Sequence, residues 1–221
     1  MEAFLKTLRC LLTIGLPLVI FIFIVVMVVN QDTDKFDSYV YIKISNFISP
    51  GLTELVKLIT FFGSSEFLIS IAGILLIFLF ANEKYSFNSS MIIINLIISA
   101  ILNEGLKHII QRSRPDILRL IDIHGYSFPS GHSMVSMSFY GLLIFLCFRN
   151  YKSKWKYIII SLFALLILFI GFSRIYLGVH FVSDVLGGFC LGIAWIGAFS
   201  TVIDLRYIKK YKFNNNEKPS K

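Results

Sequence analysis

Ionisable side chains gather in two polar segments of a largely apolar sequence. One segment covers about residues 104–132, the other runs from residue 174 to residue 184, and together they contain all four histidines of the chain. Ionisable groups at membrane depth are costly and usually functional. We single out three cations, two histidines, one carboxylate and a Ser-Gly pair: Lys107, Arg114, Ser130, Gly131, His132, Arg174, His180 and Asp184.

The three cations predict an anion-binding site, and phosphate is the natural ligand. Arginine presents a planar fork to oxyanions, and lysine adds a point charge. Gly131 lets the backbone approach closely, and Ser130 can cap a helix whose first N–H groups point at a bound anion. For Arg112 and Arg119, by contrast, we favour a solvated loop charge or a contact with a lipid headgroup.

The histidines and the carboxylate indicate phosphoryl transfer. His180 and Asp184 are four residues apart, which would place them on one face of a helix. The carboxylate can hold one imidazole nitrogen and leave the other as nucleophile or base. His132 lies on another element and can protonate the leaving alkoxide. A His/His/Asp metal site and a proton relay remain alternatives, although three nearby cations would repel a divalent ion.

The rest of the chain is suited to crossing a membrane. Hydrophobic residues make up 56% and charged residues only 15% of the 221 residues, against about 25% charged in soluble domains. A spanning helix needs about 17–25 mainly apolar residues. We therefore predict an all-α fold, a single integral membrane domain over residues 1–221 with six transmembrane helices. The expected spans are about 8–30, 64–82, 85–104, 132–148, 156–173 and 180–203.

The segment between the first two spans, residues 31–65, carries apolar residues at helical spacing on both sides of a Ser-Pro-Gly break at 49–51. This pattern predicts two short amphipathic helices that lie at the outer interface or pack on the bundle. A structural cap is the favoured role, and admission of a lipid is the alternative. The apolar positions are Phe36, Val40, Ile44, Phe47 and Ile48, then Leu55, Val56, Ile59 and Phe62.

The distribution of basic residues predicts the orientation. With the N-terminus inside, the inner segments hold 13 of the 21 Lys and Arg residues and the outer segments hold 8. Because basic residues concentrate in cytoplasmic loops, we expect both termini in the cytoplasm and the polar cluster outside, in a plasma membrane. A net charge of +8 would suit nucleic acid, but the concentration of the basic residues in the inner segments fits membrane orientation instead, so we expect no nucleic-acid partner. The cysteines, Cys10, Cys147 and Cys190, lie in or beside spans and predict neither a disulfide nor a metal site.

Three stretches resemble the signature motifs of the type 2 phosphatidic acid phosphatase superfamily. "KHIIQRSRP" at 107–115, "PSGH" at 129–132 and "SRIYLGVHFVSD" at 173–184 meet each fixed position and gap of K-x6-RP, PSGH and SR-x5-H-x3-D. The resemblance implies that His180 is the nucleophile of a phosphohistidine intermediate, that Asp184 orients it, and that His132 is the general acid. It also implies phosphate binding, without metal or other cofactor, by Lys107, Arg114, Arg174, Ser130 and the backbone of Gly131.

The resemblance further implies hydrolysis of a lipid phosphate or diphosphate at the outer face of the membrane. Undecaprenyl diphosphate and phosphatidylglycerol phosphate are the leading substrates, with phosphatidic acid also open. Two alternatives remain, a lipid-phosphate phosphotransferase and a non-enzymatic protein that binds or flips lipid headgroups. The second is disfavoured because gripping a headgroup needs neither an acid nor a nucleophile. The expected partners are the bilayer and the lipid substrate, and the sequence does not determine the oligomeric state.

Overall fold

The computed structural model describes residues 1–81, 83–116 and 118–216, and within these ranges the regular structure is entirely helical. This confirms the predicted all-α class. The elements, in chain order, are α1 (Glu2–Cys10), the π-helical turn η1 (Leu11–Gly15), α2 (Leu16–Val29), α3 (Asp34–Ser45), α4 (Pro50–Phe61), α5 (Ser65–Ala81), α6 (Glu83–Ile110), α7 (Gly131–Asn150), α8 (Lys156–Tyr176) and α9 (Val182–Asn216).

Among the described residues, six helical segments are long and apolar enough to cross a membrane, as the sequence predicted. The second segment starts earlier than expected. It runs from Pro50 to Ile77 and so includes α4, one of the two predicted outer helices, which continues into α5 through the turn at 62–64. The turn lies close to α8, because a Cβ on Gly63 would come within 2.6 Å of Ile170. The six segments are Thr7–Val29, Pro50–Ile77, Ser89–Ile110, Gly131–Asn150, Lys156–Tyr176 and Val182–Asp204.

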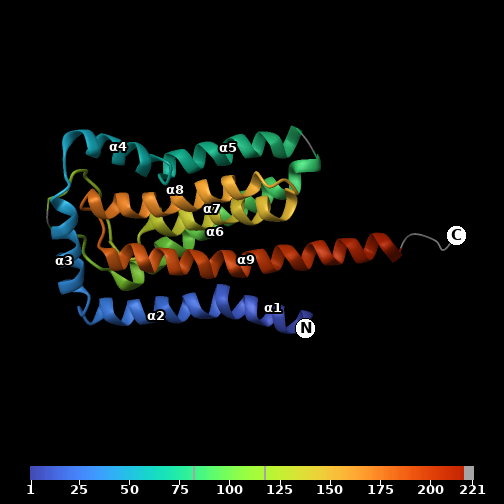
Figure 1. Cartoon of the computed structure of the whole chain (residues 1–221), viewed down its shortest axis with the longest axis horizontal. Helices are drawn as coiled ribbons and strands as arrows, with labels where there is room; N and C mark the ends of the chain where they lie inside the picture. The colour runs from blue at the N-terminus through green and yellow to red at the C-terminus, as the bar shows by residue number, and fades with distance from the viewer. Residues whose placement is uncertain (82, 117, 217–221) are drawn as a thin grey trace.

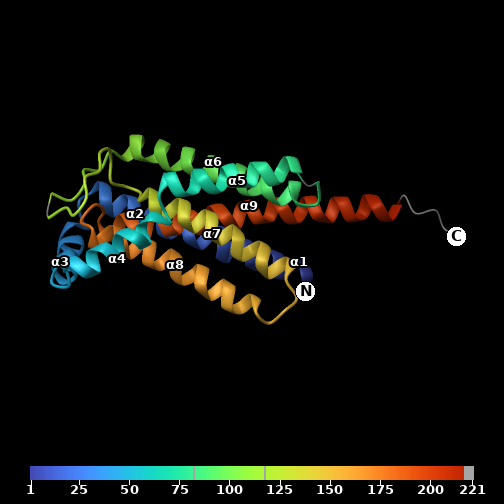
Figure 2. The same cartoon turned by 90° about the horizontal axis from the view of Figure 1, so that it is seen from above.

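The long helices run along one axis, and α3 lies across one end of them (Figures 1 and 2). We call this the α3 end. The loop between α6 and α7 and the turn between α8 and α9 also lie there, whereas α1 and the last turns of α9 point to the opposite end. At that opposite end Asp204 of α9 pairs with Arg9 of α1, at 2.7 Å, and with Arg149 of α7. Helix α1 and the last described turns of α9 therefore lie on the side of the bundle away from the polar loops (Figure 1).

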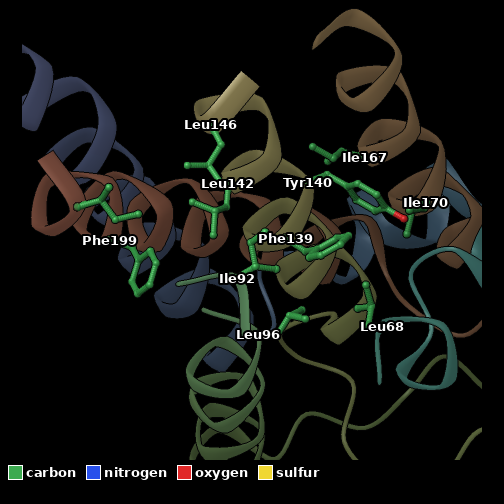
Figure 3. Packing of buried hydrophobic residues seen from close by; sticks show 11 residues of the cluster. Leu68, Ile92, Leu96, Phe139, Tyr140, Leu142, Leu146, Ile167, Ile170 and Phe199 are labelled. Atoms are coloured by element: carbon green, nitrogen blue, oxygen red, sulfur yellow. The ribbon is translucent and has the colours of Figure 1, made fainter. Parts of the chain in front are cut away.

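Helix α7 is the central helix, packed on α6, α8 and α9. Apolar side chains from these helices and from α5 meet around it (Figure 3), among them Leu142, Ile170 and Ile203, which are fully buried. Polar side chains are buried in the same interior. Asn95 donates to the Ser138 carbonyl, at 3.1 Å, and accepts from the Ser138 hydroxyl and the Trp195 indole. In lipid, small and polar residues at helix contacts are the usual means of association.

Glycine residues let α9 approach α7 closely. A Cβ on Gly188 would lie 2.8 Å from the Ser130 carbonyl oxygen, and a Cβ on Gly192 would lie 2.7 Å from the Met137 Cβ and 3.0 Å from the Met134 carbonyl oxygen. Real Cβ atoms essentially never come that close, so a larger residue would push the helices apart. The close contact matters for the site, since α7 and α9 each begin at the α3 end.

Replacement of Gly192 by alanine is expected to destabilise the bundle. The added methyl group meets backbone and Cβ atoms of α7, which cannot rotate away, and overpacking of this kind costs about 1–3 kcal/mol. The matched control is Gly73→Ala in α5, where an added Cβ meets nothing within 4 Å. We expect a lower melting temperature in detergent for Gly192→Ala and no loss for Gly73→Ala. Equal melting temperatures for the two variants would contradict the tight α7–α9 contact.

Candidate active site

The predicted residues come together in one cavity at the α3 end. Six of the eight line the same cavity of about 570 Å³: Lys107, Arg114, Gly131, His132, Arg174 and His180. The other two, Ser130 and Asp184, are fully buried directly behind it. The residues come from the end of α6, the following loop, the start of α7, the end of α8, and the turn into α9. Elements far apart in the sequence thus contribute to one concave surface.

His180 and Asp184 are in contact, but not as successive turns of one helix. Helix α9 begins at Val182, so His180 belongs to the preceding turn. The Asp184 carboxylate reaches back, as in a capping box, and accepts the backbone N–H of Phe181 at 2.8 Å. The same oxygen lies 3.4 Å from His180 Nδ1. The predicted pair therefore exists because the acid caps the helix that the histidine precedes.

The contacts of His180 define which ring nitrogen is free. Arg114 Nη1 lies 3.2 Å from His180 Nε2. A guanidinium can only donate, so Nε2 must carry the lone pair and Nδ1 the proton, facing Asp184 and the Ser127 hydroxyl at 3.3 Å. Burial lowers the pKa of His180 to about 4, with Asp184 opposing the shift. The ring is consequently neutral near pH 7, with its nucleophilic nitrogen toward the cavity cations.

Each of the three cations is held differently. Arg114 donates to the carbonyl oxygens of Gly125, Val179 and His124, and burial lowers its pKa although Asp184 opposes this. Arg174 is 1% exposed and donates to Thr60 of α4 at 2.8 Å, while its Nε is buried with no hydrogen-bond partner.

Lys107 Nζ lies 3.7 Å from Glu104, and both residues line the cavity. A buried donor without a partner is costly, so the Nε of Arg174 is suited to receive an anion.

The Pro-Ser-Gly-His turn is fixed by hydrogen bonds from both sides. The Ser130 hydroxyl caps α7 by accepting the N–H of Ser133, as the sequence predicted. Asn103 of α6 donates to the Pro129 carbonyl oxygen at 3.3 Å, and the N–H of Ser130 donates to the Asp184 carbonyl oxygen at 3.1 Å. A Cβ on Gly131 would approach Asn103 to 3.0 Å. The turn therefore holds the backbone of Gly131 at the wall of the cavity that Lys107 and Arg174 also line.

Arg112 is not the solvated loop charge that the sequence favoured. Its side chain is only 10% exposed and lies between two buried carboxylates, with Nη1 2.8 Å from Asp184 and Nη2 2.8 Å from Asp37. Burial alone would lower its pKa, but these carboxylates raise it above its ordinary value. Arg112 occupies a variable position in K-x6-RP, and its partner Asp37 lies 75 residues away in the sequence. Because nothing in the motif relates the two residues, the sequence did not predict their contact. Arg119, in contrast, is exposed.

The inward side of helix α3 combines polar and apolar residues: Asp37 and Tyr41 are buried, and Ile44 packs against the cluster of Val56 and Tyr176. Phe36 is 53% exposed, whereas Asp37 and Tyr41 are 1% and 4% exposed. The Tyr41 hydroxyl donates to the Leu118 carbonyl oxygen at 2.6 Å. Apolar side chains of a membrane protein can face lipid, so the apolar periodicity did not reveal the polar residues on the inward face of this helix. Sequence reasoning accordingly missed Asp37, Ser127 and Thr60.

The cavity continues from the charged residues into an apolar groove between two helices. Leu68, Ile69, Ala72 and Leu76 line it from α5. The facing wall comes from α6, with Ile93, Leu96, Ile97 and Ala100. Several of these side chains, including Ile69 at 70% and Ile97 at 53%, are exposed in the absence of a bilayer. The same cavity thus has a cationic end and an apolar end that opens at the surface of the spans.

Comparisons with known proteins point to one family. The model of the PAP2 superfamily matches residues 88–208. Phosphatidylglycerophosphatase B of Bacillus subtilis is 36% identical over 146 residues, covering 65% of this chain and 71% of that protein. An undecaprenyl-diphosphatase of Sulfolobus acidocaldarius is 29% identical over 160 residues, covering 69% and 71%.

Solved structures agree with this result. The crystal structure of a transmembrane PAP2 type phosphatidylglycerolphosphate phosphatase from Bacillus subtilis superposes with a TM-score of 0.75 at 28% identity. It covers 93% of this chain and 98% of that one. The structure of Aquifex aeolicus LpxE gives a TM-score of 0.60 at 26% identity, covering 74% and 93%.

Proposed function

The chain belongs to the PAP2 superfamily and is a phosphatase, and from that premise we propose that it hydrolyses a membrane lipid phosphate or diphosphate through a phosphohistidine on His180. The observation that carries the proposal is the single cavity that joins His180 and three cations to an apolar groove. Names of relatives favour phosphatidylglycerol phosphate or undecaprenyl diphosphate as the lipid.

In the first step His180 Nε2 attacks phosphorus, and the bond from phosphorus to the lipid oxygen breaks. Arg114 Nη1, which lies 3.2 Å from His180 Nε2 in the structure, would donate to a phosphate oxygen instead. Arg174 and Lys107 would bind the other oxygens and stabilise the transition-state charge. His132, which lines the same cavity, would donate a proton to the leaving oxygen. These cations supply the positive charge that a metal would otherwise provide, so the proposed reaction is metal-independent.

In the second step water attacks the phosphohistidine. His132, deprotonated by the first step, would accept a proton from the water as its oxygen bonds to phosphorus. The phosphorus–nitrogen bond breaks, Nε2 regains its lone pair, and inorganic phosphate leaves. Asp184 holds the Nδ1 proton throughout and stabilises the positive charge on the ring while Nε2 is phosphorylated. A lipid alcohol in place of water would give phosphotransfer, and product analysis with a competing alcohol distinguishes the two.

Replacement of His180 by alanine is expected to abolish phosphate release, because the nucleophile is lost. Purified protein with EDTA should release inorganic phosphate from phosphatidylglycerol phosphate or undecaprenyl diphosphate, and the variant should be at least about a thousandfold slower. With ³²P-labelled substrate the wild type should trap acid-labile, alkali-stable label. His108→Ala, at a side chain 66% exposed, is the matched control and should stay within about twofold. Full activity of His180→Ala would exclude the mechanism.

Replacement of Ala72 by tryptophan tests the proposed tail groove. The indole would fill the groove between α5 and α6 and exclude part of a long lipid tail from it. Each CH₂ group of the tail that is no longer buried would cost about 0.8 kcal/mol of binding free energy. We expect kcat/KM for a long-chain lipid to fall about tenfold or more, and that for a short water-soluble phosphate ester to stay within about twofold. Gly73→Trp, next to it on α5 but outside the cavity lining, is the control. Equal losses on both substrates would refute the groove assignment.

We also propose that the site faces the outside of the plasma membrane and that both termini are cytoplasmic. The excess of Lys and Arg in the predicted inner segments supports this, as does the position of α1 and the end of α9 away from the α3 end.

Cysteine labelling tests the orientation. In a variant without Cys10, Cys147 and Cys190, single cysteines are placed at two exposed positions, Asp116 in the α6–α7 loop and Lys152 in the α7–α8 loop. An impermeant maleimide should label position 116 in intact cells and position 152 only after permeabilisation. The reverse pattern would put the active site in the cytoplasm.

A further inference from the structure

We propose that Arg112 and Asp37 are positioning residues for the reaction, acting through Asp184 on the nucleophile. The inference rests on the proposed function of His180. Asp37 belongs to α3, which precedes the residues 88–208 that match the family model. Neither side chain lines the cavity that contains His180 and His132. Of the residues assigned to the reaction, Asp184 is the one that Arg112 contacts directly, with Nη1 2.8 Å from Oδ1.

Arg112 connects the two carboxylates with hydrogen bonds from both ends of its guanidinium. Nη1 donates to Asp184 Oδ1 at 2.8 Å and to the Ser183 hydroxyl at 2.6 Å. Nη2 donates to Asp37 Oδ2 at 2.8 Å and to the Thr33 hydroxyl at 3.0 Å. The ring of Phe181 lies over the guanidinium, 4.2 Å from its centre. A planar fork held at so many points has one orientation, which a lysine could not reproduce in full.

Asp37 completes this network by capping α9 from another helix. Its Oδ1 accepts the N–H of Ser183 at 2.9 Å, and its Oδ2 accepts the Ser183 hydroxyl at 2.5 Å. Asp184 accepts a second N–H at the same helix start, from Phe181. Helix N-termini favour negative charge, and Arg112 supplies the remaining positive charge between the two acids. Both acids are 1% exposed or less, so loss of Arg112 would leave them buried and uncompensated.

For the reaction, the consequence of this network is that it orients the Asp184 carboxylate toward His180. Oδ1 is held by Arg112, which leaves Oδ2 for Ser127 at 2.5 Å and for His180 Nδ1 at 3.4 Å. Because Arg112 fixes Oδ1, the Asp184 carboxylate cannot rotate about its Cβ–Cγ bond. Oδ2 therefore stays the oxygen that faces the imidazole of His180. Helix α3 is thus part of the catalytic apparatus, since Asp37 holds the arginine that orients the acid behind the nucleophile.

The test compares Arg112→Gln and Arg112→Lys with Arg119→Gln, an exposed arginine of the same loop. In metal sites, the partners that orient the ligands are worth about 10- to 100-fold in activity, and we expect a factor of that size for the arginine that orients Asp184. We expect kcat of Arg112→Gln to fall by that factor with KM within about twofold, because substrate contacts in the cavity are unchanged. Arg112→Lys should recover part of kcat, since it restores the charge without the fork. Arg119→Gln should match the wild type.

Asp37→Asn and Asp34→Asn form a second matched pair on α3. Asp34 also approaches Arg112, at 3.4 Å, but is 58% exposed. We expect about a tenfold loss of kcat for Asp37→Asn and none for Asp34→Asn. If kcat of Arg112→Gln and Asp37→Asn stays within twofold of the wild type, or if KM rises in place of a fall in kcat, the positioning role is wrong. If Arg112→Gln has a lower melting temperature and Arg112→Lys recovers none of the lost kcat, the network has only a structural role.

Vanadate binding separates this inference from the proposed function. Vanadate resembles the phosphoryl transition state, so its affinity follows the orientation of His180 whichever lipid is the substrate. Calorimetry should show tenfold weaker binding to Arg112→Gln and unchanged binding to Arg119→Gln. Wild-type protein that binds vanadate but releases no phosphate would refute the proposed hydrolysis alone. Equal vanadate affinity in Arg112→Gln and the wild type would refute the positioning role alone.

Discussion

The structure of the site depends on one buried carboxylate, that of Asp184. It is fully buried and accepts hydrogen bonds from Arg112, Ser127 and the backbone of Phe181, with His180 Nδ1 at 3.4 Å. A buried charge is tolerated only when it is paired and hydrogen-bonded. Meeting that condition ties the α6–α7 loop, the turn before α9 and helix α3 to the same point. The hydrogen bonds that compensate this buried carboxylate therefore fix the positions of the elements around the site.

The membrane makes such an arrangement possible, because side chains facing lipid are apolar and polar groups gather inside. Helix α7 buries Ser133, Ser136 and Ser138, and α3 buries Asp37. The glycine contacts of α9 bring its start against the Pro-Ser-Gly-His turn, where Gly188 lies under Ser130. A tight α7–α9 contact in the bundle thus sets the distance between the Pro-Ser-Gly-His turn and His180, the proposed nucleophile.

The position of the cavity relates the fold to a lipid substrate. Its charged end holds Arg114, Arg174 and Lys107, and its apolar end lies between α5 and α6. In the proposed reaction the headgroup would reach the cations while the tail stays among the apolar side chains of the spans. At the charged end Arg174 is 1% exposed and its Nε has no hydrogen-bond partner, which supports the proposed contact with a phosphate. Charge and hydrophobicity are therefore separated along one continuous surface.

The sequence by itself determined the number of spans and the identity of the motif residues, because hydropathy and fixed spacings are local properties. It also predicted the Ser130 cap, which depends on residues three apart. Only the tertiary structure decided that Arg112 is buried, that α3 turns Asp37 inward, and that α4 joins the second span. Each of these depends on contacts between residues far apart in the chain, such as Asp37 with Ser183, separated by 146 positions. A spacing pattern contains no information about such partners, so the network behind the nucleophile emerges only when the helices pack.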